Sequence, residues 1–327
     1  MGVWGLLSTI TMCSPPIGQR MSFEPSRLPE KLLLPKEDRT VLIVDGHAWA
    51  YHIFQRSGNC WWTGGDLRSL DAAATKWVTE LRAAGVEPRF VFDGMVPAMK
   101  AATALKRGQE NARKIEGVLK EIRLRQGQAP DTSEFALPVG TIPGLCEVLL
   151  REGVACVRAR YEADCDVAAE CALHSALGVL SNDSDFLCMS VPMLPLSEMT
   201  LDAGVFRAVV YAPEEVAKAL GLPKERLPHL ACMVGNDHIN RDRLANFHET
   251  LAPLSSNKRS SVVIRAVAKL LASTGADPDA ELGEEEDREL VRQMYSEEDR
   301  HGGDAEVEDA LVTEFREART HYSTEDG

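Results

Sequence analysis

The amino-acid sequence predicts an α/β fold with a mostly parallel central sheet flanked by helices, a helical insert and a C-terminal helical segment. Short, almost continuously apolar runs such as residues 40–45 (TVLIVD) are typical of strands covered on both faces, and they alternate with longer segments of helical periodicity. Strand–helix–strand units of this length join parallel strands. With 327 residues, of which 44% are hydrophobic, the chain is large enough to bury one large core or two smaller ones.

The start of the chain predicts a short helix, because Val3, Leu6 and Ile10 fall on one helical face. It lacks the basic region of a signal peptide, and Leu6 stands where a myristoylation motif needs Ser or Thr. The proline-rich residues 13–38 predict an irregular surface connection. No apolar run in the sequence is long enough to cross a bilayer.

The sheet is predicted to begin with the buried strand 40–45 and to continue, after a helix over about 66–84, with RFVFDG at 89–94. Asp66 is the expected N-cap of that helix, and Gly85 ends it. A long helical insert follows. The further expected elements are helix 142–152, strand 154–159, helix 164–175, strands 177–181 and 206–211, helices 241–252 and 258–272, and one helix near 305–319.

The net charge of −14 is unevenly distributed. Residues 281–327 hold 17 Asp and Glu against 5 Arg, a net charge of −12, which leaves −2 for residues 1–280. We therefore expect an acidic, flexible tail and compensating positive surface elsewhere, so the overall charge does not exclude a nucleic-acid partner. The eight cysteines form no pair of zinc-site spacing, which indicates a reduced, intracellular protein.

Acidic residues stand at the ends of the apolar runs and are the strongest functional signal. They are Asp45, Asp93, Glu162, Asp164, Asp183, Asp185 and Asp237. In an open parallel sheet the site lies at the carboxyl ends of the strands, so these side chains are expected to meet. A pair of divalent cations would satisfy many buried carboxylates at once. Such ions promote in-line hydrolysis of a phosphodiester, so the pattern predicts a two-metal nuclease using Mg²⁺ or Mn²⁺.

Each of these acids alone also has an ordinary structural explanation. Asp45–Gly46 and Asp93–Gly94 are common turn sequences, and Asp183 is a plausible helix N-cap. The i,i+2 spacing of Glu162 with Asp164 and of Asp183 with Asp185 favours a shared site, because extended backbone points such pairs to the same side.

The motifs resemble the flap endonuclease/XPG nucleases, which have a PIN-like fold, and in particular their Asteroid branch. The resemblance rests on MGVWGL, IVDGHA, VFDG, EADCD, NDSDF and GNDH, which occur in the family's order over residues 1–275. It implies that the seven acids bind metal and that Gly2 packs close to DNA. It also places Lys100 and Arg107 on a helix over the scissile phosphate, where they would offset developing charge.

The insert from Lys100 to Arg125 holds eight Lys and Arg against three Glu, so a nucleic-acid backbone is expected to run along it, although such charges are often merely solvated. The residues assigned to this contact are Lys106, Arg113, Lys114, Lys258 and Arg259. The segment around Lys258 lacks the Gly-rich turn with which flap endonucleases grip duplex DNA. Trp61 and Trp62 either stack on unpaired bases or pack in the core.

With this resemblance the chain divides into four parts. They are residues 1–138, XPG N-terminal-like with the basic insert at about 97–126; residues 139–240, XPG internal or Asteroid-like; residues 241–275, a helical segment; and residues 276–327, the acidic tail. The predicted function is a structure- or strand-selective DNA endonuclease, and nuclear localisation follows only from that function. A non-catalytic PIN-like scaffold that binds nucleic acid or protein, and an RNA-directed nuclease, remain the alternatives.

Overall fold

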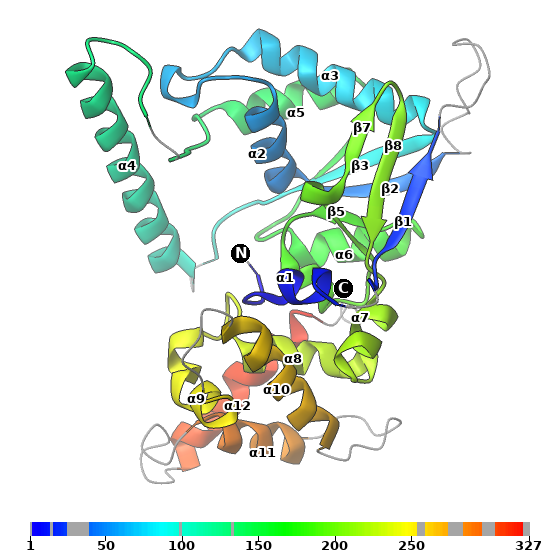
Figure 1. Ribbon diagram of the computed structural model, residues 1–327, viewed down its shortest axis with the longest axis vertical. Coiled ribbons are helices and arrows are strands. Elements are labelled where there is room, and N and C mark those ends of the chain that lie inside the picture. Colours follow the sequence, from blue (N-terminus) through cyan, green and yellow to red (C-terminus); the bar gives the residue numbers. More distant parts are fainter. Residues whose placement is uncertain are drawn as a thin grey trace.

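The computed structural model describes residues 2–13, 16–24, 39–97, 100–131, 134–253, 259–273, 284–295 and 305–322. Within them the predicted α/β fold is confirmed: a five-stranded parallel sheet with strand order β4-β3-β2-β5-β6 lies between helices (Figure 1). The strands are β2 (Thr40–Asp45), β3 (Val86–Phe92), β4 (Ala155–Arg158), β5 (Val179–Ser181) and β6 (Met193–Pro195). No helix in these ranges is long and apolar enough to span a membrane.

Alternation along the strands divides the apolar side chains between the two faces of the sheet. On one face Val44 and Phe90 pack with Trp49 and Trp77, and on the other face Ile43 belongs to a second buried cluster. The covering helices are α2 (Gly46–Arg56), α3 (Leu67–Ala83), α5 (Thr141–Arg151) and α6 (Asp164–Leu173). Helix α2 was not predicted from the sequence; it begins directly after β2.

The interpretation of residues 13–38 as an irregular connection is wrong for residues 19–23. They form β1 (Gln19–Phe23), the edge of a small antiparallel sheet with β8 (Val205–Val210) and β7 (Thr200–Asp202). The prolines lie outside the strand, and Phe23 stacks on Phe206 with ring centroids 5.9 Å apart. This pairing partner is far away in the sequence, so local composition did not reveal the strand.

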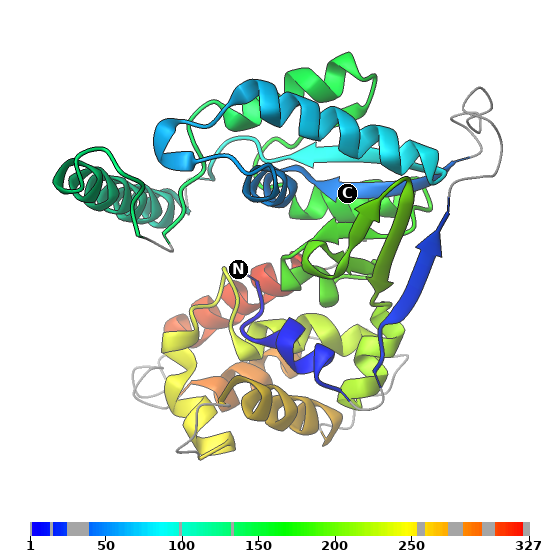
Figure 2. The ribbon, with the colours of Figure 1, turned by 45° about the horizontal axis from the view of Figure 1, so that its top comes forward.

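The basic insert forms the single helix α4 (Ala101–Leu124), which stands away from the rest of the molecule (Figures 1 and 2). Of its described side chains only Val118 is fully buried, and it faces the short helix η2 (Trp61–Thr63). Trp61 is also buried, against Trp62 and Phe135, so core packing explains Trp61.

A layer of helices lies below the sheets in Figure 1. It consists of α1 (Leu6–Thr11), α7 (Pro213–Leu220), α8 (Leu227–Val234), α9 (Ala245–Leu251), α10 (Arg259–Ser273), α11 (Glu284–Met294) and α12 (Ala305–Thr320). The last two helices correct the prediction that residues 276–327 form a flexible, exposed tail. The predicted helix near 305–319 is present, and both α11 and α12 pack into the layer.

Amphipathic patterning explains why this acidic region folds. Val291, Val312 and Phe315 are buried in the same apolar cluster as α8, while most of the acidic residues face outward. The net charge of this region therefore reflects the exposed surface of these helices and gives no sign of their apolar faces. Asp287 and Glu308 are exceptions; Asp287 is fully buried and accepts hydrogen bonds from Arg316 Nε (3.1 Å) and Arg319 Nη2 (3.2 Å).

We predict that Asp287→Ala destabilises the protein by about 3 kcal/mol, because removing one partner of a buried ion pair leaves the other charges uncompensated. Urea unfolding of the full chain measures this. The matched control is Asp309→Ala, which breaks an ion pair to Arg288 at a carboxylate that is 60% exposed and should cost less than about 1 kcal/mol. Equal costs for the two substitutions would contradict the packing of α11 against α12.

Candidate functional site

The predicted acidic residues come together at the carboxyl edge of the parallel sheet, and we call this cluster the acidic edge. Asp45 ends β2, Asp93 directly follows β3, and Asp183 follows β5. Asp164 begins α6, the helix after β4, and its charge acts on Asp45, Asp183 and Asp185. Asp164 therefore lies at the centre of the group.

Asp45 is fixed by two hydrogen bonds. Its carboxylate accepts from the backbone N–H of Ala48 (3.0 Å), as the N-cap of α2, and from Ser181 Oγ (2.7 Å). Burial raises the pKa of Asp45 to about 6, against these hydrogen bonds and with the help of the Asp164 and Asp93 charges. Ser181 was not predicted, although it precedes Asp183 by two residues and so points to the same side.

Asp183 and Asp185 form a compact turn on the short helix η4 (Ser184–Leu187). Asp183 Oδ1 accepts the Asp185 N–H at 3.1 Å, and Tyr322 Oη donates to Asp185 Oδ1 at 3.1 Å. Burial, followed by the charges of Asp183 and Asp164, raises the pKa of Asp185 to about 8. The pKa of Asp183 is raised as well, again mainly by burial.

Gly2 lies against this turn with a left-handed backbone, φ 72°. A Cβ atom at this position would overlap Asp183 Oδ1, Ser184 Oγ and the Asp185 backbone nitrogen. The structure therefore brings Gly2 to the acidic edge, where any larger residue would displace Asp183.

Both predicted catalytic cations contact predicted metal ligands. Lys100 Nζ lies 2.7 Å from Glu162 Oε2, and Arg107 Nη2 lies 3.4 Å from Asp237 Oδ2. Both cations come from the start of the insert and reach across to other elements. They serve at present as partners of the carboxylates.

Asp93 is held differently from these two acids. Its Oδ1 accepts the N–H of Ala163 at 2.9 Å. His47 Nδ1 lies 3.3 Å from Asp93 Oδ2 but accepts the Asp93 backbone N–H at 3.2 Å. His47 Nδ1 therefore acts as a hydrogen-bond acceptor at this position.

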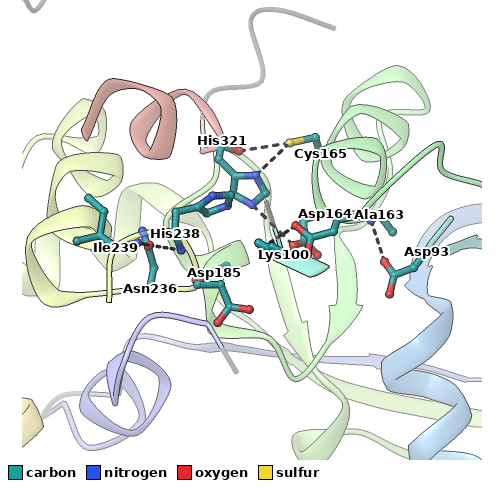
Figure 3. A network of polar contacts seen from close by, with 12 residues as sticks. Asp93, Lys100, Ala163, Asp164, Cys165, Asp185, Asn236, His238, Ile239 and His321 are labelled. Atoms are coloured by element: carbon teal, nitrogen blue, oxygen red, sulfur yellow. Dashed lines mark hydrogen bonds and ion pairs between the residues drawn. The ribbon is translucent and has the colours of Figure 1, made fainter. Parts of the chain in front are cut away.

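A third cation comes from the end of α12, and no pattern in the sequence predicts it at this site. His321 Nε2 lies 3.7 Å from Asp164 Oδ2, and its Nδ1 lies 3.6 Å from Cys165 Sγ (Figure 3). Its ring packs beside His238, with centroids 4.5 Å apart. Burial alone would lower the pKa of His321, but Asp164 and Cys165 outweigh it and raise this pKa to about 10, so the imidazole is charged at neutral pH.

The side chains of the acidic edge have the right chemistry to bind divalent cations, but they are not arranged around a common point. Carboxylate oxygens are the ligands that Mg²⁺ prefers. Across the described parts of the chain, however, no three His, Cys, Asp or Glu side chains surround a point where an ion could sit. Four of the carboxylates instead contact Lys100, Arg107, His321 and Tyr322.

The predicted nucleic-acid contacts on α4 are solvent-exposed. Lys106 and Arg113 face solvent, and Lys114 does so while pairing with Glu134 at 3.3 Å. Lys258 and the side chain of Arg259 lie outside the described residues.

The pKa shifts predict that the metal-free protein loses stability as the pH rises from 7 to 9. Asp185 and His321 have folded-state pKa values of about 8 and 10, above their ordinary values of 3.8 and 6.5, so the folded state binds more protons in this range. Their stabilising contribution is complete below the ordinary values and is lost as the pH rises through the folded values.

Urea midpoints at pH 7, 8 and 9 with a chelator present test this expectation. The wild-type midpoint should fall with pH, and the midpoint of Asp185→Asn/His321→Asn should fall much less. Parallel pH profiles for the two proteins would show that these groups are not protonated as described.

Comparisons with known proteins agree with the resemblance of the motifs to the flap endonuclease/XPG nucleases. Residues 153–237 match the family model described as XPG I-region, and residues 220–324 match the FAM120A-like domain. The chain is 31% identical over 215 residues to a constitutive coactivator of peroxisome proliferator-activated receptor gamma from Bos taurus, covering 64% of this chain and 30% of that protein. It is 28% identical over 166 residues to flap endonuclease 1 from Methanosphaerula palustris, covering 47% and 49%.

Two solved structures are similar to the chain at lower identity. The catalytic core of Rad2 in complex with DNA has a TM-score of 0.47 at 19% identity, covering 95% of this chain and 84% of that one. Human GEN1 with Holliday junction DNA has a TM-score of 0.48 at 16% identity, covering 98% and 64%. A GEN1 structure with product DNA contains a Mg²⁺ ion.

The chain spans half or less of the length of these curated relatives, whose names are those of coactivators and flap endonucleases and not of Asteroid proteins. The XPG I-region contains Glu162, Asp164, Asp183, Asp185 and Asp237. Residues 153–237 of the chain therefore carry the XPG I-region of the XPG/flap endonuclease superfamily.

Proposed function

We propose that this chain is a nucleic-acid-binding module on an XPG-type fold, in which the acidic edge stabilises the structure and does not hydrolyse phosphodiesters. One observation carries the proposal: the groups that a nuclease of this type would use on metal and phosphate are paired with one another. Lys100 is bound to Glu162 and Arg107 to Asp237. A binding role also agrees with the similarity to proteins named as coactivators.

The nucleic acid would contact α4. Lys106, Arg113 and Lys120 recur every seven residues, so they form one exposed stripe along a helix that stands off the molecule. Such a stripe follows a phosphate backbone without reading bases, so single-stranded DNA and RNA are expected to bind similarly and with strong salt dependence. The acidic edge would repel phosphate beyond the start of α4 and so limit the length of the contact.

We predict that Lys106→Gln/Arg113→Gln/Lys120→Gln weakens binding to a labelled single strand. The slope of log affinity against log salt should fall by about 0.7 for each phosphate that the variant no longer neutralises. Fluorescence anisotropy between about 50 and 200 mM salt, without divalent ions, measures both quantities. The matched control, Lys76→Gln/Lys218→Gln/Lys224→Gln, removes three cations from α3, α7 and the turn after α7. If both triple variants bind equally weakly, α4 is not the binding surface.

The second candidate is the divalent-metal-dependent DNA endonuclease, of the Asteroid type, that the motifs predict. It is favoured by the seven carboxylates at one edge and by the similarity to flap endonucleases. Bound ions would supply a nucleophile and charge stabilisation, and Lys100 and Arg107 would then be released to contact phosphate.

A cleavage assay separates the two functions. Single-stranded, flap and duplex DNA and a matched RNA are incubated with Mg²⁺ or Mn²⁺, with Asp183→Asn/Asp185→Asn as the control. We expect binding without products. Metal-dependent products that disappear in the double variant would overturn the binding-module proposal and establish the nuclease.

A further inference from the structure

The end of α12 reaches out of the helical layer to the acidic edge. Helix α12 is anchored in that layer by Phe315 and by the Arg316 and Arg319 contacts to Asp287. The chain then turns, and the Tyr322 N–H donates to the Arg319 carbonyl at 3.0 Å. We call His321 and Tyr322, the two residues after the helix, the α12 tip.

The α12 tip contacts two acidic residues that come from different elements. His321 Nε2 pairs with Asp164 at the start of α6, and Tyr322 Oη donates to Asp185 on η4. Only 1% of Tyr322 is exposed, so its ring also covers Asp185 from solvent. The side chains of one dipeptide thus occupy positions on two carboxylates at the centre of the group.

Neighbouring residues fix the α12 tip in place. Cys165 Sγ contacts both His321 Nδ1 (3.6 Å) and the His321 carbonyl (3.5 Å), and His238 packs on the imidazole ring. The backbone of His238 is held in turn, because its N–H donates to Asn236 Oδ1 at 2.8 Å (Figure 3). These contacts favour a single position for the imidazole beside Asp164.

We propose that the α12 tip is a plug, which competes with divalent cations for the acidic edge and prevents them from binding there while it is seated. A cation shared by Asp164 and Asp185 must displace the imidazole and the phenol hydroxyl. The free energy of their contacts is then subtracted from the free energy of ion binding. The proposal rests on the proposed function. In a binding module, a plug would keep divalent cations away from the carboxylates of the acidic edge.

Mn²⁺ binding to the full chain, measured by the EPR signal of free Mn²⁺ in the absence of nucleic acid, tests the plug. We expect His321→Asn/Tyr322→Phe to bind Mn²⁺ at least about tenfold more tightly than the wild type, equivalent to about 1.4 kcal/mol. Adding Asp185→Asn to this variant should abolish the gain, which assigns the ion to the acidic edge. The phenylalanine keeps the buried ring, so the fold is expected to survive.

The matched control is His174→Asn/Tyr51→Phe, which makes the same substitutions at a His–Glu pair at the far end of α6 and at an exposed tyrosine. It should bind Mn²⁺ like the wild type. If the double variant lowers Tm too far for titration, His321→Asn alone is used, and Mn²⁺ should raise its Tm but not that of the wild type. Unchanged Mn²⁺ affinity in the folded tip variants would overturn the plug.

The two proposals fail separately. Anisotropy of the α4 variants contains no divalent ion, and the Mn²⁺ titration contains no nucleic acid. A tip variant that binds Mn²⁺ tightly and cleaves DNA would support the plug and overturn the binding module. A tip variant that gains no Mn²⁺ affinity would overturn the plug and leave the nucleic-acid interface of α4 as proposed.

Discussion

The convergence of parallel strands on one edge is the constraint on which the rest of the molecule depends. Because β2, β3 and β5 run in the same direction, their following residues meet whether or not their charges are compatible. The carboxylates must therefore be neutralised by protons, by metal or by cations of the chain. Here the chain supplies cations from two remote places, the start of α4 and the end of α12. The site therefore connects parts of the fold that are far apart in the sequence.

The amino-acid sequence was sufficient to predict four strands of the parallel sheet (β2 to β5), the insert and the acidic edge, because each depends on local patterns. It missed β6 and counted β8, which belongs to the antiparallel sheet, with the central sheet. Apolar runs reveal buried strands, and a carboxylate after each run reveals the edge. The prediction that Lys100 and Arg107 approach the site came only from the resemblance. Their binding to Glu162 and Asp237 depends on how α4 is oriented, which no local pattern encodes.

The parts that the sequence did not reveal depend on contacts between distant segments. Strand β1 forms because it pairs with β8. His321 contacts Asp164 only because α12 ends next to α6. The acidic composition after residue 280 predicts disorder, whereas the buried face of α12 decides that it folds. Notably, the α12 tip belongs to the FAM120A-like region, while the acids that it contacts belong to the XPG I-region.

The pairing of β1 with β8 has a consequence for how the chain reaches its native state. Gln19 pairs with Val210, so more than half of the chain must be ordered or looped out before this ladder can close. Such high contact order slows folding and leaves the waiting strand edge open to other chains. During synthesis the first strand is therefore the last to find its partner, and a fragment that stops before β8 would leave it unpaired and prone to aggregation.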